Sequence, residues 1–264
     1  MEKDIFIFLR LIICSLSLRL YCKFILSSTV EIVNIFNNLV KGVCPLCRES
    51  ATLGQFCYAC KEDILASIHY HSPRCSYCQL PLNDKGLCDN CHYYHLSLTV
   101  YSAFDYAPPL DSLVLRFKNN GQTHLSTCFA QLIFEQLIKK NHLPDKRTVL
   151  IPIPSKKNSL KKRAYNPASL FAKSLAKKLQ CQLDLSTLRC RQQANADQKT
   201  LSRLDRFVSS RDQYYCSRRV NYTDVILIDD ILTTGSTLES ASRALLAAGA
   251  QNVQAIVIAR TITT

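Results

Sequence analysis

The fold is decided by the stretch Val225-Ile-Leu-Ile-Asp-Asp-Ile-Leu-Thr-Thr-Gly-Ser-Thr237. Its first four residues predict a buried strand that ends at Asp229-Asp230. A short Thr/Gly/Ser loop follows and leads directly into residues 238–248, which predict a helix closed by Gly249. Ligands of open α/β sheets bind outside the carboxyl ends of strands, so we expect a binding site at this strand–loop–helix junction.

The polar groups of this stretch suit a phosphorylated ribose. Backbone N–H groups and hydroxyls of the loop can surround a phosphate, and the start of a helix adds positive potential. Gly235 lets the backbone approach an anion without a Cβ in the way, and the two carboxylates suit the vicinal hydroxyls of a ribose. The candidate binding residues are Asp229, Asp230, Leu232, Thr233, Thr234, Gly235, Ser236 and Thr237.

Two alternatives compete with a phosphoribosyl site. One is an ordinary strand–turn–helix in which Thr and Ser merely cap the helix. The other is a P-loop or dinucleotide site, which needs glycines at fixed spacings. The six glycines of the chain never lie five positions apart and form no G-x-G-x-x-G, so the sequence disfavours both nucleotide motifs.

Strands and helices alternate in the second half of the chain, which predicts an α/β domain with a parallel sheet. Asn166 with Pro167 behind it is a typical helix start. Residues 189–219 are polar and weakly periodic, so we expect a loop or a short helical excursion there. The other predicted strands are 98–104, 148–153 and 253–259, and the helical segments are 110–117, 125–139 and the one that starts at Asn166.

Eight of the 14 cysteines form a tandem repeat. Each unit has the form C-x2-C-x9-C-x2-C, and the second follows the first at an offset of 31 residues. Two C-x-x-C pairs supply the four sulfurs of a structural zinc site. The predicted ligands are Cys44, Cys47, Cys57 and Cys60 for one ion and Cys75, Cys78, Cys88 and Cys91 for another; a cross-braced pairing and disulfides are the alternatives.

The net charge of +13 is concentrated in one part of the chain. Residues 146–219 hold 18 basic residues against four acids, a difference of +14. Such a segment favours polyanionic partners, either phosphorylated nucleotides or a nucleic-acid backbone, over a plain solvated surface. The candidate contacts for pyrophosphate or nucleic acid are Lys156, Lys157, Lys161, Lys162 and Arg163.

The first 40 residues contain short apolar stretches that Arg10, Arg19 and Lys23 interrupt. None reaches the length of a membrane span, and no signal-peptide pattern is present. We expect a leader over 1–40, a cysteine module over 41–95 and the α/β domain over 98–264. The metal-ligand spacing of the cysteines indicates a reducing cytoplasm, with a membrane-peripheral role of the leader as an alternative.

The stretch 225–237 resembles the phosphoribosyl pyrophosphate (PRPP) motif of type I phosphoribosyltransferases. Together with the cysteine repeat, it is similar to the ComF/ComFC (GntX-like) family of competence proteins over about residues 32–259. Ile151-Pro-Ile-Pro-Ser155 and Lys162-Arg-Ala-Tyr-Asn166 also match. The family usually has Arg-Gly-Phe-Asn-Gln at the second of these segments, so Ala164, Tyr165 and Pro167 depart from its pattern.

The resemblance implies a phosphoribosyltransferase-like domain behind a double zinc ribbon. It also implies PRPP with Mg²⁺ as ligand, and single-stranded DNA and DNA-uptake machinery proteins as partners in natural transformation. The alternative is an active phosphoribosyltransferase of nucleotide metabolism. No catalytic base and no pocket for a particular nucleobase stand out in the sequence, so the acceptor is unassigned.

Overall fold

The computed structural model describes residues 41–52, 54–66, 73–88, 91, 96–191 and 213–262. The leader expected over 1–40 and most of the predicted loop therefore lie outside the described residues. The chain divides into two compact units, Met1–Cys57 and Tyr58–Thr264. Within the first, β1 (Lys41–Val43) pairs antiparallel with β2 (Ser50–Thr52). Helix α2 (Tyr58–Ala66) opens the second.

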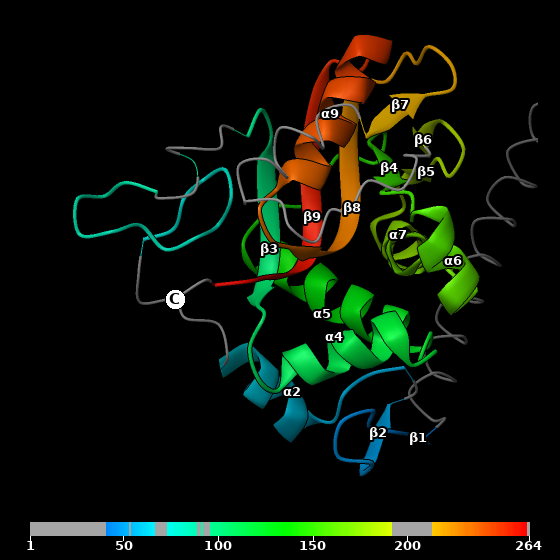
Figure 1. The fold of residues 1–264 in the computed structure, drawn as a ribbon. Coiled ribbons are helices and arrows are strands. Elements are labelled where there is room, and N and C mark those ends of the chain that lie inside the picture. The colour runs from blue at the N-terminus through cyan, green and yellow to red at the C-terminus, as the bar shows by residue number, and fades with distance from the viewer. Residues whose placement is uncertain are drawn as a thin grey trace, which may run out of the picture. The chain divides into compact units, whose positions relative to one another are not determined.

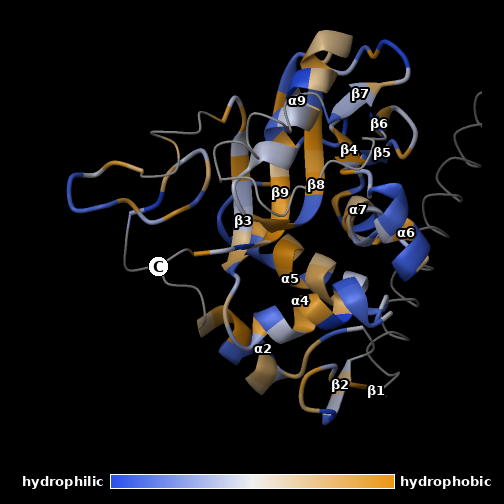
Figure 2. Ribbon diagram, in the orientation of Figure 1, coloured by the Kyte–Doolittle hydropathy of each residue, from blue (hydrophilic) through white to orange (hydrophobic). Residues whose placement is uncertain are grey.

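A five-stranded, wholly parallel sheet forms the centre of the larger unit (Figure 1). The prediction of an α/β fold with a parallel sheet is confirmed. The longest strands lie next to each other in the middle and carry uninterrupted apolar runs, as expected for strands covered on both faces (Figure 2). In spatial order the strands are β3 (Thr99–Asp105), β9 (Asn252–Arg260), β8 (Asp224–Leu232), β4 (Val149–Pro152) and β5 (Gln182–Leu183).

Helices cover both faces of this sheet. Val225 and Leu227 of β8 share a buried cluster with Leu238 and Leu245 of α9 (Ser236–Ala248). Successive strand residues point to opposite faces, so Ile226 and Ile228 face the other way. There β8 and β4 contact α7 (Pro167–Leu179), which packs against α5 (Leu125–Lys139), and α5 in turn contacts α4 (Leu110–Asn119).

Most sequence-predicted elements are found within a few residues of their expected bounds. Helix α5 matches its predicted range, 125–139. The Asn166 side chain accepts a hydrogen bond from the backbone N–H of Ala168 at 3.1 Å and so caps α7, with Pro167 at the first position. The Asn166 Nδ2 also donates to the Ile153 carbonyl at 2.9 Å, which ties the helix start to the end of β4.

Two predictions of local structure are corrected. Strand β8 does not end at residue 228 but continues to Leu232, because its neighbour β9 pairs with it along the whole length. The predicted loop 189–219 begins and ends in an antiparallel ribbon, in which β6 (Leu188–Cys190) pairs with β7 (Tyr214–Cys216). A strand of three residues is too short for its periodicity to be recognised in the sequence.

The second cysteine repeat is part of the larger unit's core. Cys75 and Cys78 belong to the same buried cluster as Val225 and Leu227. The Arg74 guanidinium donates to both carboxylate oxygens of the buried Asp105 in β3, each at 2.7 Å. A bidentate pair of this kind fixes orientation as well as position, so this repeat is held firmly against the edge of the sheet.

Candidate functional site

The predicted binding loop connects β8 to α9 at the carboxyl end of the sheet. Leu232 is buried, and its carbonyl accepts hydrogen bonds from Arg260 and from the Thr261 backbone, both at 3.0 Å. Thr233 is exposed, and Thr234, Ser236 and Thr237 are half-buried. The structure thus brings the candidate residues 229–237 together as one continuous strand–loop–helix segment.

Gly235 has a backbone conformation that other residues adopt only with strain. Its φ is +85°, in the left-handed region. A Cβ built there would lie 2.7 Å from Cδ2 of the buried Leu96. Both the backbone angle and the close approach therefore require glycine, and the loop packs on the segment that precedes β3.

Helix α9 begins without a side-chain cap from the described residues. The Ser236 N–H has only a long contact to Thr234 Oγ1, at 3.4 Å, and the two hydroxyls lie 3.1 Å apart. Glu239 in the first turn does not face the loop, because it accepts hydrogen bonds from the Ser97 N–H and the Arg243 side chain, each at 2.7 Å. The Glu239 N–H donates to the Gly235 carbonyl at 2.9 Å, so the N–H groups of residues 236–238 at the loop are those without intrahelical partners. This arrangement suits an anion.

The two aspartates have different surroundings, as expected for consecutive residues of a strand. Asp230 is buried and forms an ion pair with Lys118 of α4, with 2.9 Å between Oδ1 and Nζ. Asp229 is half-buried and accepts a hydrogen bond from the Asp230 N–H at 2.9 Å. Of the two carboxylates, Asp229 is the one without a basic partner among these contacts.

Burial and the neighbouring charge of Asp230 raise the pKa of Asp229 to about 7, although the Asp230 N–H and Lys118 act in the opposite direction. Burial raises the pKa of Tyr214 as well, and the Asp229 charge contributes to that rise. Tyr214 lies in β7, and its N–H donates to Ser240 Oγ of α9 at 3.3 Å. The Asp229 carboxylate therefore takes up a proton near neutral pH in the absence of a ligand.

The predicted basic contacts form helix α6 (Lys157–Arg163), with Lys156 as its N-cap. No residue of α6 is buried, and the four lysines are exposed. Most of this helix has hydrophilic colouring in Figure 2. This helix follows β4, whose end lies beside β8 because the Ile153 N–H donates to the Ile228 carbonyl at 2.9 Å. Helix α6 and the binding loop therefore both follow the carboxyl ends of neighbouring parallel strands, β4 and β8.

Sequence reasoning missed two contributors, Lys118 and the Ser97–Glu239 contact. Each reaches the site from a segment distant in the chain. Lys118 is 112 residues from its partner, and Ser97 is 142 residues from Glu239. A lysine in an amphipathic helix carries no local sequence pattern that would identify its partner.

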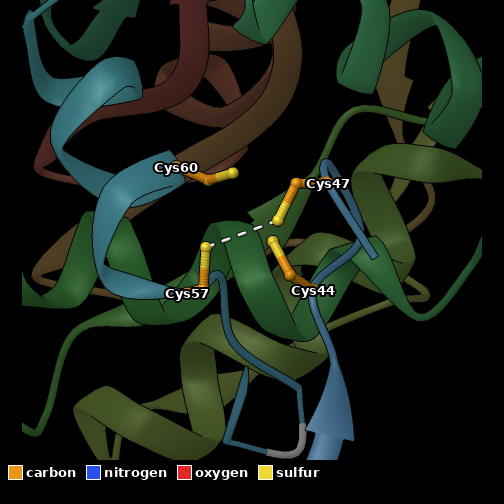
Figure 3. A group of neighbouring side chains, drawn as sticks. All are labelled: Cys44, Cys47, Cys57 and Cys60. Carbon is orange, nitrogen blue, oxygen red and sulfur yellow. Dashed lines mark hydrogen bonds between the residues drawn. The ribbon is translucent and has the colours of Figure 1, made fainter. Parts of the chain in front are cut away.

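The eight predicted metal ligands form two four-cysteine groups with the simple sequential pairing, not the cross-braced one. In each group the four sulfurs lie within 4.8 Å of one another, and Figure 3 shows the four side chains of the first group converging. Measured separations are 3.5 Å for Cys47–Cys57 and 3.4 Å for Cys78–Cys88. None of the described cysteines forms a disulfide.

These separations fit a tetrahedral metal. Four thiolates at a Zn–S distance of about 2.3 Å are roughly 3.8 Å apart. Backbone geometry repeats between the groups as well: the N–H of Arg48 donates to Cys44 and that of Gln79 donates to Cys75, both at 2.9 Å. Arg48 and Gln79 both have positive φ, 68° and 61°. The 31-residue repeat is therefore structural, with the same tight turn in both units.

Comparison with known protein families identifies the domain. The family described as phosphoribosyl transferase domain matches residues 131–263, half of the chain. The chain belongs to this family. The phosphoribosyl transferase domain includes β4, α6, α7, β8, α9 and β9, and hence the whole binding loop.

Three curated proteins are similar to this chain over most of their own length. The DNA utilization protein YhgH of Salmonella typhi is 28% identical over 232 residues, 84% of this chain and 99% of the relative. Competence protein F of Haemophilus influenzae is 26% identical, over 83% and 90% of the two chains. Competence protein ComFC of Bacillus subtilis is 29% identical, over 73% and 78%. The chain, with its two four-cysteine groups, is a member of the ComF/ComFC/YhgH family.

In the described part of the chain, no helix has both the length and the apolar character that crossing a membrane requires.

Proposed function

We propose that this protein binds PRPP, or a related 5-phosphoribosyl ligand, at residues 229–237 and handles single-stranded DNA during natural transformation. The uncapped start of α9 carries the first half of this proposal. Its N–H groups, the Thr234 and Ser236 hydroxyls and the glycine-dependent turn form a cradle for a 5-phosphate. Asp229 lies at the end of the cradle nearest the sheet, where the hydroxyls of a ribose diol would donate hydrogen bonds to its carboxylate.

Mg²⁺ fits this site as a companion of the ligand. Among the described residues, the groups able to hold a metal through three or more side chains are the two cysteine groups. With Asp230 paired to Lys118, Mg²⁺ would be coordinated mainly by pyrophosphate and ribose oxygens, as is usual for this ion. Bound there, it neutralises charge on the pyrophosphate. The lysines of α6 lie beyond the carboxyl end of β4, next to the strand that carries the binding loop, and would add positive charge near the pyrophosphate.

The DNA half of the proposal rests on charge and on the family. Basic residues outnumber acids by 14 over residues 146–219, a field that attracts polyanions. The relatives are named for DNA utilization and for competence. The two cysteine groups each hold one structural Zn²⁺ in this proposal, since all four positions are filled and none is left for a substrate.

Calorimetric titration of the zinc-loaded protein with Mg²⁺ and PRPP tests the cradle. We expect the Asp229→Ala/Asp230→Ala variant to lose at least tenfold in affinity. Asp224→Ala removes a carboxylate from the exposed start of the same strand and should leave the affinity unchanged. Equal affinity in the double variant and the control would refute the site.

An active phosphoribosyltransferase is the second candidate, favoured by the domain match over residues 131–263. Such an enzyme would stabilise an oxocarbenium-like ribose while pyrophosphate leaves. The assay is pyrophosphate release from PRPP with a panel of nucleobases. Turnover with any base establishes transfer, and tight PRPP binding without turnover with every base supports a ligand-sensing role.

A further inference from the structure

We infer that the β6–β7 ribbon is a binding surface for single-stranded DNA, with Tyr215 as a stacking platform for a base. This inference rests on the proposed function and locates its DNA-handling part. The ribbon has two faces of different character. Leu188 and Tyr214 are buried toward α9, where Cys216 Sγ also contacts the Ala244 carbonyl at 3.3 Å.

The other face of the ribbon is exposed and basic. Arg189 pairs directly with Tyr215 across the two strands, so their side chains lie on the same face. Both are exposed, and 40% of the tyrosine surface is accessible. Arg191, two residues after Arg189, places its guanidinium carbon 5.1 Å from the centre of the Tyr215 ring. An ordered, exposed aromatic ring flanked by two arginines is thus built into a regular element.

The charged side chains of the described part of the ribbon are arginines. Among the described residues 188–191 and 213–219 there are four arginines and no acid. Asp184, the nearest acid in these contacts, is buried and already accepts hydrogen bonds from Arg218 and Tyr222. Exposed arginines such as Arg189 and Arg191 attract phosphates.

The tyrosine indicates single strands in preference to a duplex. Proteins that bind single strands without sequence preference combine a basic groove with aromatic side chains on which unpaired bases stack, and arginine adds to this stacking. In a duplex the base faces are covered by their neighbours. The ribbon also lies beside α9, since Tyr214 contacts Ser240 one turn after the cradle. A strand on this surface would therefore pass next to the nucleotide site.

Fluorescence anisotropy with labelled oligo(dT) of about 20 nucleotides, measured on the zinc-loaded full chain at several salt concentrations, tests the surface. A stacked base contributes about 1–3 kcal/mol, so Tyr215→Ala should weaken binding about 5- to 150-fold. Tyr215→Phe keeps the ring and should bind like the wild type. Arg189→Gln/Arg191→Gln should lower the slope of log K against log salt by about 1.4, that is, about 0.7 per phosphate contact.

Lys173→Gln/Lys177→Gln is the matched control, because it removes two exposed charges from α7 on the opposite face of the sheet. We expect it to leave the slope unchanged. The inference is overturned if the ribbon variants behave like this control, or if duplex DNA binds equally well and loses the same affinity. If the wild type does not bind oligo(dT), the DNA half of the proposed function fails. Unchanged Mg²⁺–PRPP affinity in the ribbon variants shows that they are folded.

Discussion

Replacing Asp229 with Asn should stabilise the protein at neutral pH. Burial and Asp230 raise the pKa of Asp229 from 3.8 to about 7 in the folded chain. The carboxyl therefore binds its proton more tightly in the folded chain than in the unfolded chain. Below about pH 4 the group is protonated in both states and does not affect the free energy of unfolding. As the pH rises from about 4 toward 7, the free energy of unfolding of the wild type falls. Asparagine keeps the oxygen that accepts the Asp230 N–H but carries no charge.

The size of this effect follows from the shift. A pKa that rises from 3.8 to about 7 lowers the free energy of unfolding by about 4 kcal/mol at most. About 2 kcal/mol of this loss develops between pH 5.5 and 8. Because the side chain is only half-buried, solvent screening reduces this to about 1–2 kcal/mol. The expected result is a gain in the free energy of unfolding for Asp229→Asn over wild type that grows by this amount between pH 5.5 and 8.

Urea denaturation at several pH values in this range, with zinc present throughout, measures the gain. Asp224→Asn on the exposed start of β8 is the control, and its difference from wild type should not change with pH. The reasoning fails if the Asp229→Asn difference is equally flat. The same variant should bind Mg²⁺–PRPP more weakly, because the Asp229 carboxylate is the group proposed to accept hydrogen bonds from the ribose.

Three further predictions follow from local geometry. Gly235→Ala should lower the free energy of unfolding by about 1–2 kcal/mol and weaken Mg²⁺–PRPP binding, because a Cβ would meet Leu96 at 2.7 Å and φ is +85°; urea denaturation and calorimetry measure these losses, and wild-type values for both would contradict the turn's role. Ala164→Gly should stabilise the protein by about 1 kcal/mol in the same assay, because Ala164 ends α6 with a left-handed φ of 64°; a loss of stability would refute this. Cys78→Ser should lower the zinc content from two ions per chain to one and also lower the thermal unfolding midpoint of the larger unit, because Cys78 is in that unit's core. Cys47→Ser, at an exposed cysteine, should also remove one zinc but lower that midpoint less. A chromophoric chelator measures the zinc content, and equal midpoints in the two variants would contradict the different burial of the two groups.

Much of the fold was predictable because its strongest patterns are local. Helix α5 has an apolar period sustained over 15 residues, and the start of α7 is marked by Asn166 and Pro167. The cysteine spacing predicted both four-cysteine groups. The part that could not be predicted depends on partners distant in the chain. Strand β8 extends beyond its apolar run because β9 pairs with it, and Asp230 is neutralised by a lysine 112 residues away.

The candidate site shows the same division. The turn at Gly235 was predictable because glycine and hydroxyl residues between a strand and a helix are typical of such a turn, whereas the ligand of this loop stays a prediction. Consecutive strand residues are expected to face opposite ways, but the pairing of Asp230 with Lys118 was not foreseeable from the sequence. The ribbon that carries Tyr215 was expected to be a loop, because its two short strands are separated by 23 residues in the chain.

Leu96 lies five residues after Cys91 and fills the space against Gly235. The segment that holds the last ligand of the second cysteine group therefore also shapes the nucleotide loop. If this group holds zinc as proposed, loss of the ion would remove the fixed position of Leu96 and with it the order of the loop. Under the proposed function, metal loading and nucleotide binding are then coupled, and a chain without zinc would be deficient in both.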